Sequence, residues 1–149
     1  MDTEESTPGT VYFAFSITLL YALFWRTDGL PDRAVIATGG VMAMTWGDAL
    51  ASIVGGRWGR QGYAVWGHRR TYEGSAMMFL ASFVALLITL LVLPGSSLSP
   101  TTEPLAAGTA LLSALVVAVV ATLAEAVAPA GTDNLSVPLL TSAALYLLL

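Results

Sequence analysis

GSAMMFLASFVALLITLLVL, residues 74–93, is an uninterrupted apolar run that contains no charged side chain. A helix that crosses the hydrocarbon part of a bilayer needs about 20 consecutive apolar residues, which is the length of this run. The pair Pro94-Gly95 follows it, and glycine and proline are typical of the end of a helix. The run therefore predicts a transmembrane helix.

The remainder of the chain has the same apolar character. Of its 149 residues, 56% are hydrophobic and 11% are charged, whereas soluble domains carry about 25% charged residues. Similar runs occupy residues 10–25, 34–54, 104–128 and 135–149, and the last of them is short for a span. The sequence therefore predicts an all-α, polytopic transmembrane helical bundle with about five spans.

Two features limit the domain organisation and the chemistry. Residues 1–9 (MDTEESTPG) are acidic and polar and lack the basic region of a signal peptide. We interpret them as a polar N-terminal stretch that precedes one membrane domain, residues 10–149. Cysteine is absent and histidine occurs once, which excludes disulfides, thiolate metal sites and sites with several histidines.

The distribution of arginine predicts the orientation of the bundle. Six arginines supply all the positive side-chain charge, and four lie between the second and third apolar runs, namely Arg57, Arg60, Arg69 and Arg70. By the positive-inside rule, this connection faces the cytoplasm. Alternation of the spans then places residues 129–134 on the same side.

The second apolar run contains a carboxylate, Asp48. Its many small residues allow close helix contact in a bilayer, so we expect a central helix. A carboxylate at the centre of a span costs roughly 2.5–3.5 kcal/mol and needs a partner, a cavity or a proton. Helical spacing places it on one stripe with Ser52 and Gly55. We interpret Asp48 as functional, and the alternative is a structural polar contact.

Two further polar groups flank spans on the same side of the membrane. Arg70 lies just before Gly74 and Ser75 at a helix start, which is typical of a phosphate site, although basic residues also flank spans simply to set topology. Glu125, with residues 133–134 (Asp-Asn), offers the oxygen ligands that Mg²⁺ prefers. The alternative for residues 133–134 is a turn that caps the last helix.

Taken together, these groups combine carboxylates for a cation, arginines for phosphates and a surrounding membrane. This combination suits phosphoryl or nucleotidyl transfer to a lipid, where catalysis consists mostly of positioning and charge neutralisation. The sequence contains no P-loop, no protein-kinase motif set and no GxGxxG dinucleotide motif. Any nucleotide must therefore be held by another arrangement.

Three segments, in order, resemble the dolichol kinase/phytol kinase family, which is distantly similar to phosphatidate cytidylyltransferases. Gly47-Asp48 with IVGGRWG (residues 53–59) is similar to the family's GD and VGRRFG elements. RTYEGS (residues 70–75) is similar to its K-[ST]-x-x-G-S element, and Glu125-Ala126 with TDNLSVPL (residues 132–139) to its VE and DNLTVPL elements. Residues 9–26 are similar to the leading segment of phytol kinases.

The resemblance implies a kinase that transfers the terminal phosphate of CTP, or another nucleoside triphosphate, to an isoprenoid alcohol such as phytol, geranylgeraniol or a polyprenol. Mg²⁺ or another divalent cation would assist, and residues 10–149 would form the catalytic domain. The implied catalytic acids and metal ligands are Asp48, Glu125 and Asp133. The implied nucleotide-binding residues are Gly47, Ser52, Gly55, Arg57, Arg70, Thr71, Gly74, Ser75 and Asn134.

Two departures from the family pattern qualify this interpretation. Arg70 stands where the family has lysine, which replaces a point charge by a planar fork. Family members also carry upstream spans with a basic segment, so we expect this chain to correspond to the C-terminal part of the family domain. Either it is a fragment that lacks an N-terminal segment, or it pairs with another subunit or with a second copy as a homo-oligomer, or it has lost activity.

Other functions stay open at this stage. They are a CTP-dependent cytidylyltransferase that makes a CDP-lipid, and a non-catalytic membrane subunit or small transporter. For each we expect an integral membrane protein surrounded by lipid, with no nucleic-acid partner. In a prokaryote it would lie in the cytoplasmic membrane with its site facing the cytoplasm.

Overall fold

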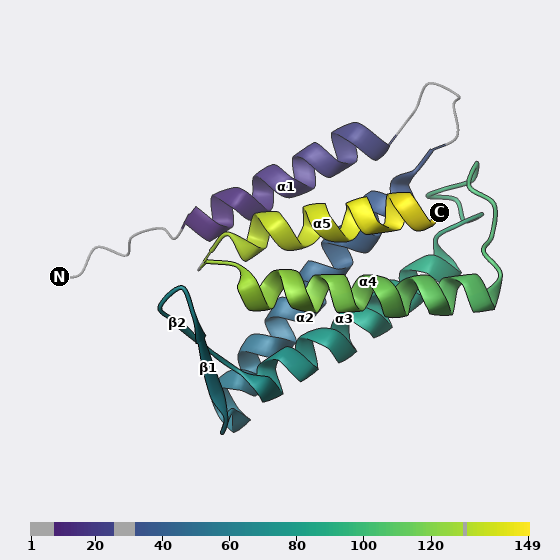
Figure 1. Cartoon of the computed structure of the whole chain (residues 1–149). Helices are drawn as coiled ribbons and strands as arrows, with labels where there is room; N and C mark the ends of the chain where they lie inside the picture. The colour runs from purple at the N-terminus through teal and green to yellow at the C-terminus, as the bar shows by residue number, and fades with distance from the viewer. Residues whose placement is uncertain (1–7, 26–31, 130) are drawn as a thin grey trace.

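A computed structural model describes residues 8–25, 32–129 and 131–149, and these residues form five α-helices and one two-stranded hairpin (Figure 1). The elements are α1 (Pro8–Phe24), α2 (Ala34–Trp58), β1 (Gly62–Val65), β2 (His68–Thr71), α3 (Tyr72–Val92), α4 (Ala107–Val127) and α5 (Asp133–Leu148). Most of the polar N-terminal stretch, together with Arg26 and Ala130, lies outside the described residues.

The helices confirm the prediction of an all-α membrane bundle. Within the described ranges, α2, α3 and α4 are long and apolar enough to cross a bilayer, while α1 is apolar but shorter, with 17 residues. On α4, small residues such as Ala114 and Ala118 are buried, whereas Leu112 and Leu123 are 63% and 60% exposed. Large apolar side chains outside and small ones inside suit a bundle surrounded by lipid.

Helix α2 is central, as its small residues predict. It packs against α3, α5, α1 and α4, and 61% of its most apolar window is buried compared with 39% in α3. The close approach to α5 needs Gly40, because a Cβ there would lie 2.6 Å from the Pro138 carbonyl oxygen. The helix ends at Trp58, beyond the predicted boundary at residue 54. It continues because the turn that contains Gly55 packs closely against Thr71, the residue before α3.

The connection between α2 and α3 is an antiparallel hairpin that the sequence analysis did not predict. Tyr63 on β1 pairs with Arg70 on β2. The two turn residues, Trp66 and Gly67, both have positive φ, 53° and 79°. A two-residue turn with both φ values positive matches the right-handed twist of the strands. The hairpin therefore directs Arg70 back toward the bundle.

A proline inside α5 is compensated by α1. Pro138 has no N–H, so the carbonyl of Asn134 loses the helical hydrogen bond that residue 138 would otherwise donate. The buried hydroxyl of Ser16 donates to this carbonyl at 3.0 Å. The bond satisfies the orphaned acceptor and attaches α1 to the start of α5.

The two ends of the bundle differ in character. Figure 1 shows the hairpin at one end, beside the last turn of α4 and the first turn of α5. At the other end, Asp32 accepts hydrogen bonds from Ser99 (2.6 Å) and Thr101 (2.7 Å), which fix the start of α2 to the connection between α3 and α4. The predicted site residues lie at the hairpin end.

Candidate functional site

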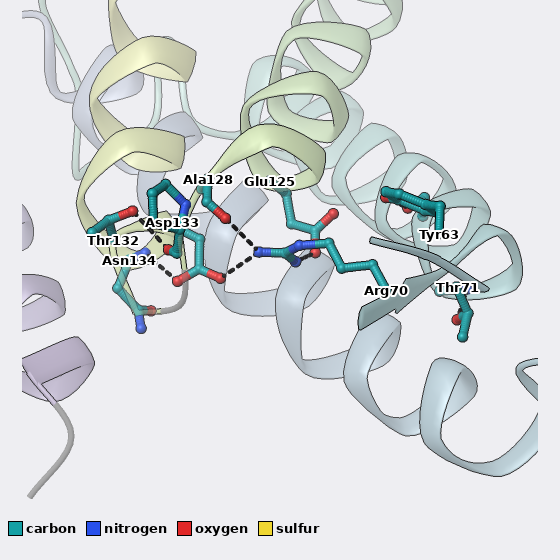
Figure 2. Close-up of polar contacts among 11 residues, drawn as sticks. Tyr63, Arg70, Thr71, Glu125, Ala128, Thr132, Asp133 and Asn134 are labelled. Atoms are coloured by element: carbon teal, nitrogen blue, oxygen red, sulfur yellow. Dashed lines mark hydrogen bonds and ion pairs between the residues drawn. The ribbon is translucent and has the colours of Figure 1, made fainter. Parts of the chain in front are cut away.

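Arg70 connects three elements at the hairpin end. Its guanidinium forms an ion pair with Glu125 of α4 and another with Asp133 of α5, at 3.3 Å, and donates a hydrogen bond to the Ala128 carbonyl at 3.2 Å. Figure 2 shows the side chain reaching from the strand, with Asp133 and Glu125 around the guanidinium. The three charged side chains are only 8–15% exposed, so solvent screens their charges weakly.

Two polar atoms of this cluster have no partner among the described residues. They are Arg70 Nε, a donor, and Glu125 Oε2, an acceptor, and both are buried. Leaving a buried polar group unpaired costs about 1–3 kcal/mol, and more when the group is charged. The cluster is therefore an incomplete network with one unpaired donor and one unpaired acceptor among the described residues.

The cluster borders a cavity of about 330 Å³ that lies between α2, the hairpin, α3 and α4. The cavity brings together eight of the residues implied by the family resemblance. They are Asp48, Ser52, Gly55, Arg70, Thr71, Gly74, Ser75 and Glu125. The helical spacing of the α2 stripe thus correctly indicated a shared face.

Several of the lining groups already bond to one another. Thr71 caps α3, its hydroxyl accepting the Gly74 N–H at 3.1 Å. The Ser75 hydroxyl lies 2.7 Å from the Tyr63 hydroxyl, which anchors β1 to α3. The first turn of α3 therefore uses these groups to hold the hairpin, and Arg69 and Arg70 are the basic side chains that line the cavity.

Four of the residues implied by the resemblance do not line the cavity. Gly47 faces Met78 of α3, and Arg57 is exposed in the last turn of α2. Asp133 contacts the cluster only through Arg70. Asn134 lies close to Gly9 of α1, and Figure 2 shows its side chain directed away from Arg70.

Other residues at the site were not singled out in the sequence. Arg69 lines the cavity, and its guanidinium lies close to Gly62 on β1. Trp66 donates its indole N–H to the Val127 carbonyl at 2.9 Å, so the turn of the hairpin contacts the end of α4. The available signal was Gly67, because glycine readily adopts the positive φ that a two-residue hairpin turn requires.

The acids do not form a preformed metal centre. Among the described residues, no group of three or more His, Asp or Glu side chains lies close enough to hold a metal ion. Glu125 and Asp133 are instead bridged by Arg70. A cation at this site would therefore need ligands from a bound substrate as well as from the protein.

Fold and site together define a class: a helical membrane protein whose acids and arginines gather at one end of the bundle. Over 131 residues the chain is 39% identical to a phytol kinase from Synechocystis sp., covering 88% of this chain and 50% of that protein. Most of this chain is therefore similar to about half of a protein named phytol kinase.

Two plant proteins from Oryza sativa subsp. japonica are also similar. Identity is 33% with a protein named probable phytol kinase 2, chloroplastic, over 93% of this chain and 42% of that protein. Identity is 30% with a protein named probable phytol kinase 1, chloroplastic, over 97% of this chain and 43% of that protein. The chain thus spans about half the length of the curated relatives it matches. No family model and no solved structure matches it.

Proposed function

We propose that the chain carries the phosphoryl-transfer site of a membrane-embedded kinase, which moves the terminal phosphate of a nucleoside triphosphate to an isoprenoid alcohol. The observation that carries the proposal is the position of Arg70 in one cavity with Asp48 and Glu125. The similarity to phytol kinases supports phytol as the acceptor, and the family resemblance supports CTP as the donor.

The charges that line the cavity favour a nucleotide accompanied by a cation. Arg69 and Arg70 are matched by Asp48 and Glu125, so the lining has no excess positive charge for a polyphosphate. Mg²⁺ commonly binds one or two carboxylates together with substrate phosphates. Glu125, together with either Asp48 or Asp133, would supply these carboxylates, and when bound the cation would neutralise charge on the transferred group.

The arrangement supports separate directions of entry for the two substrates. Asp48 lies seven residues before Gly55 on α2, or about 10 Å deeper in the membrane at about 1.5 Å per residue. An alcohol whose chain remains in the bilayer meets this carboxylate first. The nucleotide enters from the arginine-rich end, which the positive-inside rule places in the cytoplasm.

In the transfer step, the alcohol oxygen bonds to the γ-phosphorus while the bond from that phosphorus to the β–γ bridging oxygen breaks. The nucleoside diphosphate leaves, and the hydroxyl proton passes to a carboxylate, for which Asp48 is placed closest to the bilayer. Arg70 orients the phosphates as a planar fork. Positioning and charge neutralisation are the main requirements of such a step.

The test is transfer of label from γ-labelled CTP to lipid, in membranes that contain the chain. Phytol, geranylgeraniol, a polyprenol and diacylglycerol serve as acceptors in the presence of Mg²⁺. We expect label in the isoprenoid fraction and its loss in Asp48→Asn. Glu103→Gln is the matched control, because Glu103 is an exposed acid in the connection between α3 and α4.

Other outcomes contradict the proposal in distinct ways. Lipid label that comes from α-labelled CTP and phosphatidate alone would indicate a cytidylyltransferase. Absence of label with every acceptor would indicate a non-catalytic membrane subunit. Full activity of Asp48→Asn would remove that residue from the mechanism while leaving the kinase assignment intact.

A further inference from the structure

We propose that Arg70 occupies the cation position between Glu125 and Asp133 while the nucleotide is absent, and that nucleotide phosphates draw it away so that a divalent cation enters. The guanidinium is thus an internal substitute for the metal. The inference rests on the proposed function, because it requires a phosphate-bearing substrate. It adds an order of binding to that function.

The contacts of the guanidinium are those expected of a group that holds two acids together. Arg70 reaches from β2 to one carboxylate on α4 and another on α5. Without a cation between them, Glu125 and Asp133 would repel each other in a weakly screened environment. Arg70 supplies the positive charge that this pair of carboxylates requires.

The network is nevertheless incomplete in a way that indicates a ligand. Glu125 is 6% exposed and lines the cavity, yet its Oε2 has no partner among the described residues. Arg70 Nε is a second buried orphan in the same cluster. An unpaired carboxylate oxygen is suited to a cation, and an unpaired guanidinium N–H is suited to a phosphate oxygen.

The balance of charge means that Arg70 and a divalent cation cannot both lie between Glu125 and Asp133. A divalent cation beside Glu125 and Asp133 neutralises the two carboxylates that Arg70 pairs with, and Asp48 is then the one acid of the cavity lining left to balance the guanidinium. Nucleotide phosphates supply further negative charge on the cavity side. Nucleotide and cation should therefore raise each other's affinity, because such coupling is reciprocal.

The experiment measures cation binding directly and does not depend on turnover. The purified chain in lipid nanodiscs is titrated with Mn²⁺, and the nanodisc-bound ion is measured by electron paramagnetic resonance. Each titration is done with and without a non-hydrolysable CTP analogue. The variants are Arg70→Gln and Arg69→Gln, the latter removing an arginine from the same cavity whose guanidinium lies close to Gly62.

We expect wild type to bind Mn²⁺ tightly only when the analogue is present. Arg70→Gln should bind Mn²⁺ without the analogue about tenfold or more tightly than wild type, within the usual range of coupling between sites. Arg69→Gln should change this affinity much less. Equal affinities of Arg70→Gln and wild type would overturn the proposal, as would an equal gain in Arg69→Gln, which would indicate a general effect of charge.

A second variant keeps the inference testable if Arg70→Gln does not fold. Asp133→Asn removes one ligand and retains the ion pair between Arg70 and Glu125, so it should lose about tenfold in analogue-dependent Mn²⁺ affinity. Retention of full affinity would overturn the proposal.

The lipid-labelling assay separates this inference from the proposed function. If lipid is labelled but Arg70→Gln does not bind Mn²⁺ more tightly than wild type, only the proposed exchange between Arg70 and the cation is wrong. If Arg70→Gln binds Mn²⁺ more tightly but no lipid is labelled, only the proposed kinase activity is wrong.

Discussion

Arg70 on β2 and Glu125 on α4 form an ion pair that fixes the hairpin against the transmembrane bundle. The same guanidinium contacts Asp133 at the start of α5. One side chain therefore holds together three elements that meet only when the chain is folded. Stability and site geometry depend on the same contacts, and each can be measured separately.

Glu125→Gln should destabilise the protein by about 1–3 kcal/mol, because Arg70 then keeps a buried charge with only Asp133 to balance it. The measurement is the free energy of unfolding in mixed micelles with increasing denaturing detergent. Glu103→Gln, which removes an exposed acid at the opposite end, should leave this free energy unchanged. An unchanged value for Glu125→Gln would show that the ion pair does not hold the hairpin.

The bond between Ser16 and the Asn134 carbonyl gives a second expectation, which a double-mutant cycle tests. Ser16→Ala should cost about 1–2 kcal/mol, because it leaves a partly buried carbonyl without a donor. Pro138→Ala supplies the missing backbone N–H, so the same serine change should cost less in that background. Equal costs in both backgrounds would show that Ser16 does not compensate for the proline.

The helices could be predicted from the sequence because each depends on local composition. An apolar run such as residues 74–93 has few alternatives to a membrane helix, and α3 occupies Tyr72–Val92. The common cavity of Asp48, Ser52 and Gly55 followed from helical periodicity alone. These features need no knowledge of what lies across the bundle.

The remaining features depend on contacts between distant segments. Arginines in the connection before α3 indicated orientation and phosphate binding. Because they are charged, β2 does not show the alternation of apolar and polar residues that is typical of a strand, and the hairpin was not predicted. Arg70 was predicted to bind phosphates, whereas in the structure it bridges Glu125 and Asp133. The placement of Asn134 beside α1 required knowing that Pro138 leaves the Asn134 carbonyl for Ser16.

Trp66→Phe should loosen the hairpin while preserving its apolar bulk. The change removes only the indole N–H that donates to the Val127 carbonyl at 2.9 Å. A net hydrogen-bond contribution of ~0.5–1.5 kcal/mol corresponds to roughly twofold to thirteenfold more frequent opening. The measurement is the rate of tryptic cleavage after Arg69 in nanodiscs, and an unchanged rate would mean that this bond does not restrain the turn.

Asp32 gives an expectation for the effect of pH at the opposite end of the bundle. Burial acts to raise the pKa of Asp32, but hydrogen bonds from Ser99 and Thr101 outweigh it and hold the pKa below its ordinary value of 3.8. Because the folded-state pKa is the lower one, the unfolded chain binds the proton first as the pH falls. The stabilisation is complete above about pH 3.8 and is lost as the pH falls through the folded pKa.

Asp32→Asn should therefore be less stable than wild type at neutral pH and should lose less stability on acidification through this range. The measurement is the detergent-unfolding free energy at a series of pH values from neutral to below 3.8. Other carboxylates contribute equally to both proteins, so the difference between the two curves isolates Asp32. Parallel curves would show that the hydrogen bonds from Ser99 and Thr101 do not stabilise the charged carboxylate, because a stabilised carboxylate must make the two curves converge at low pH.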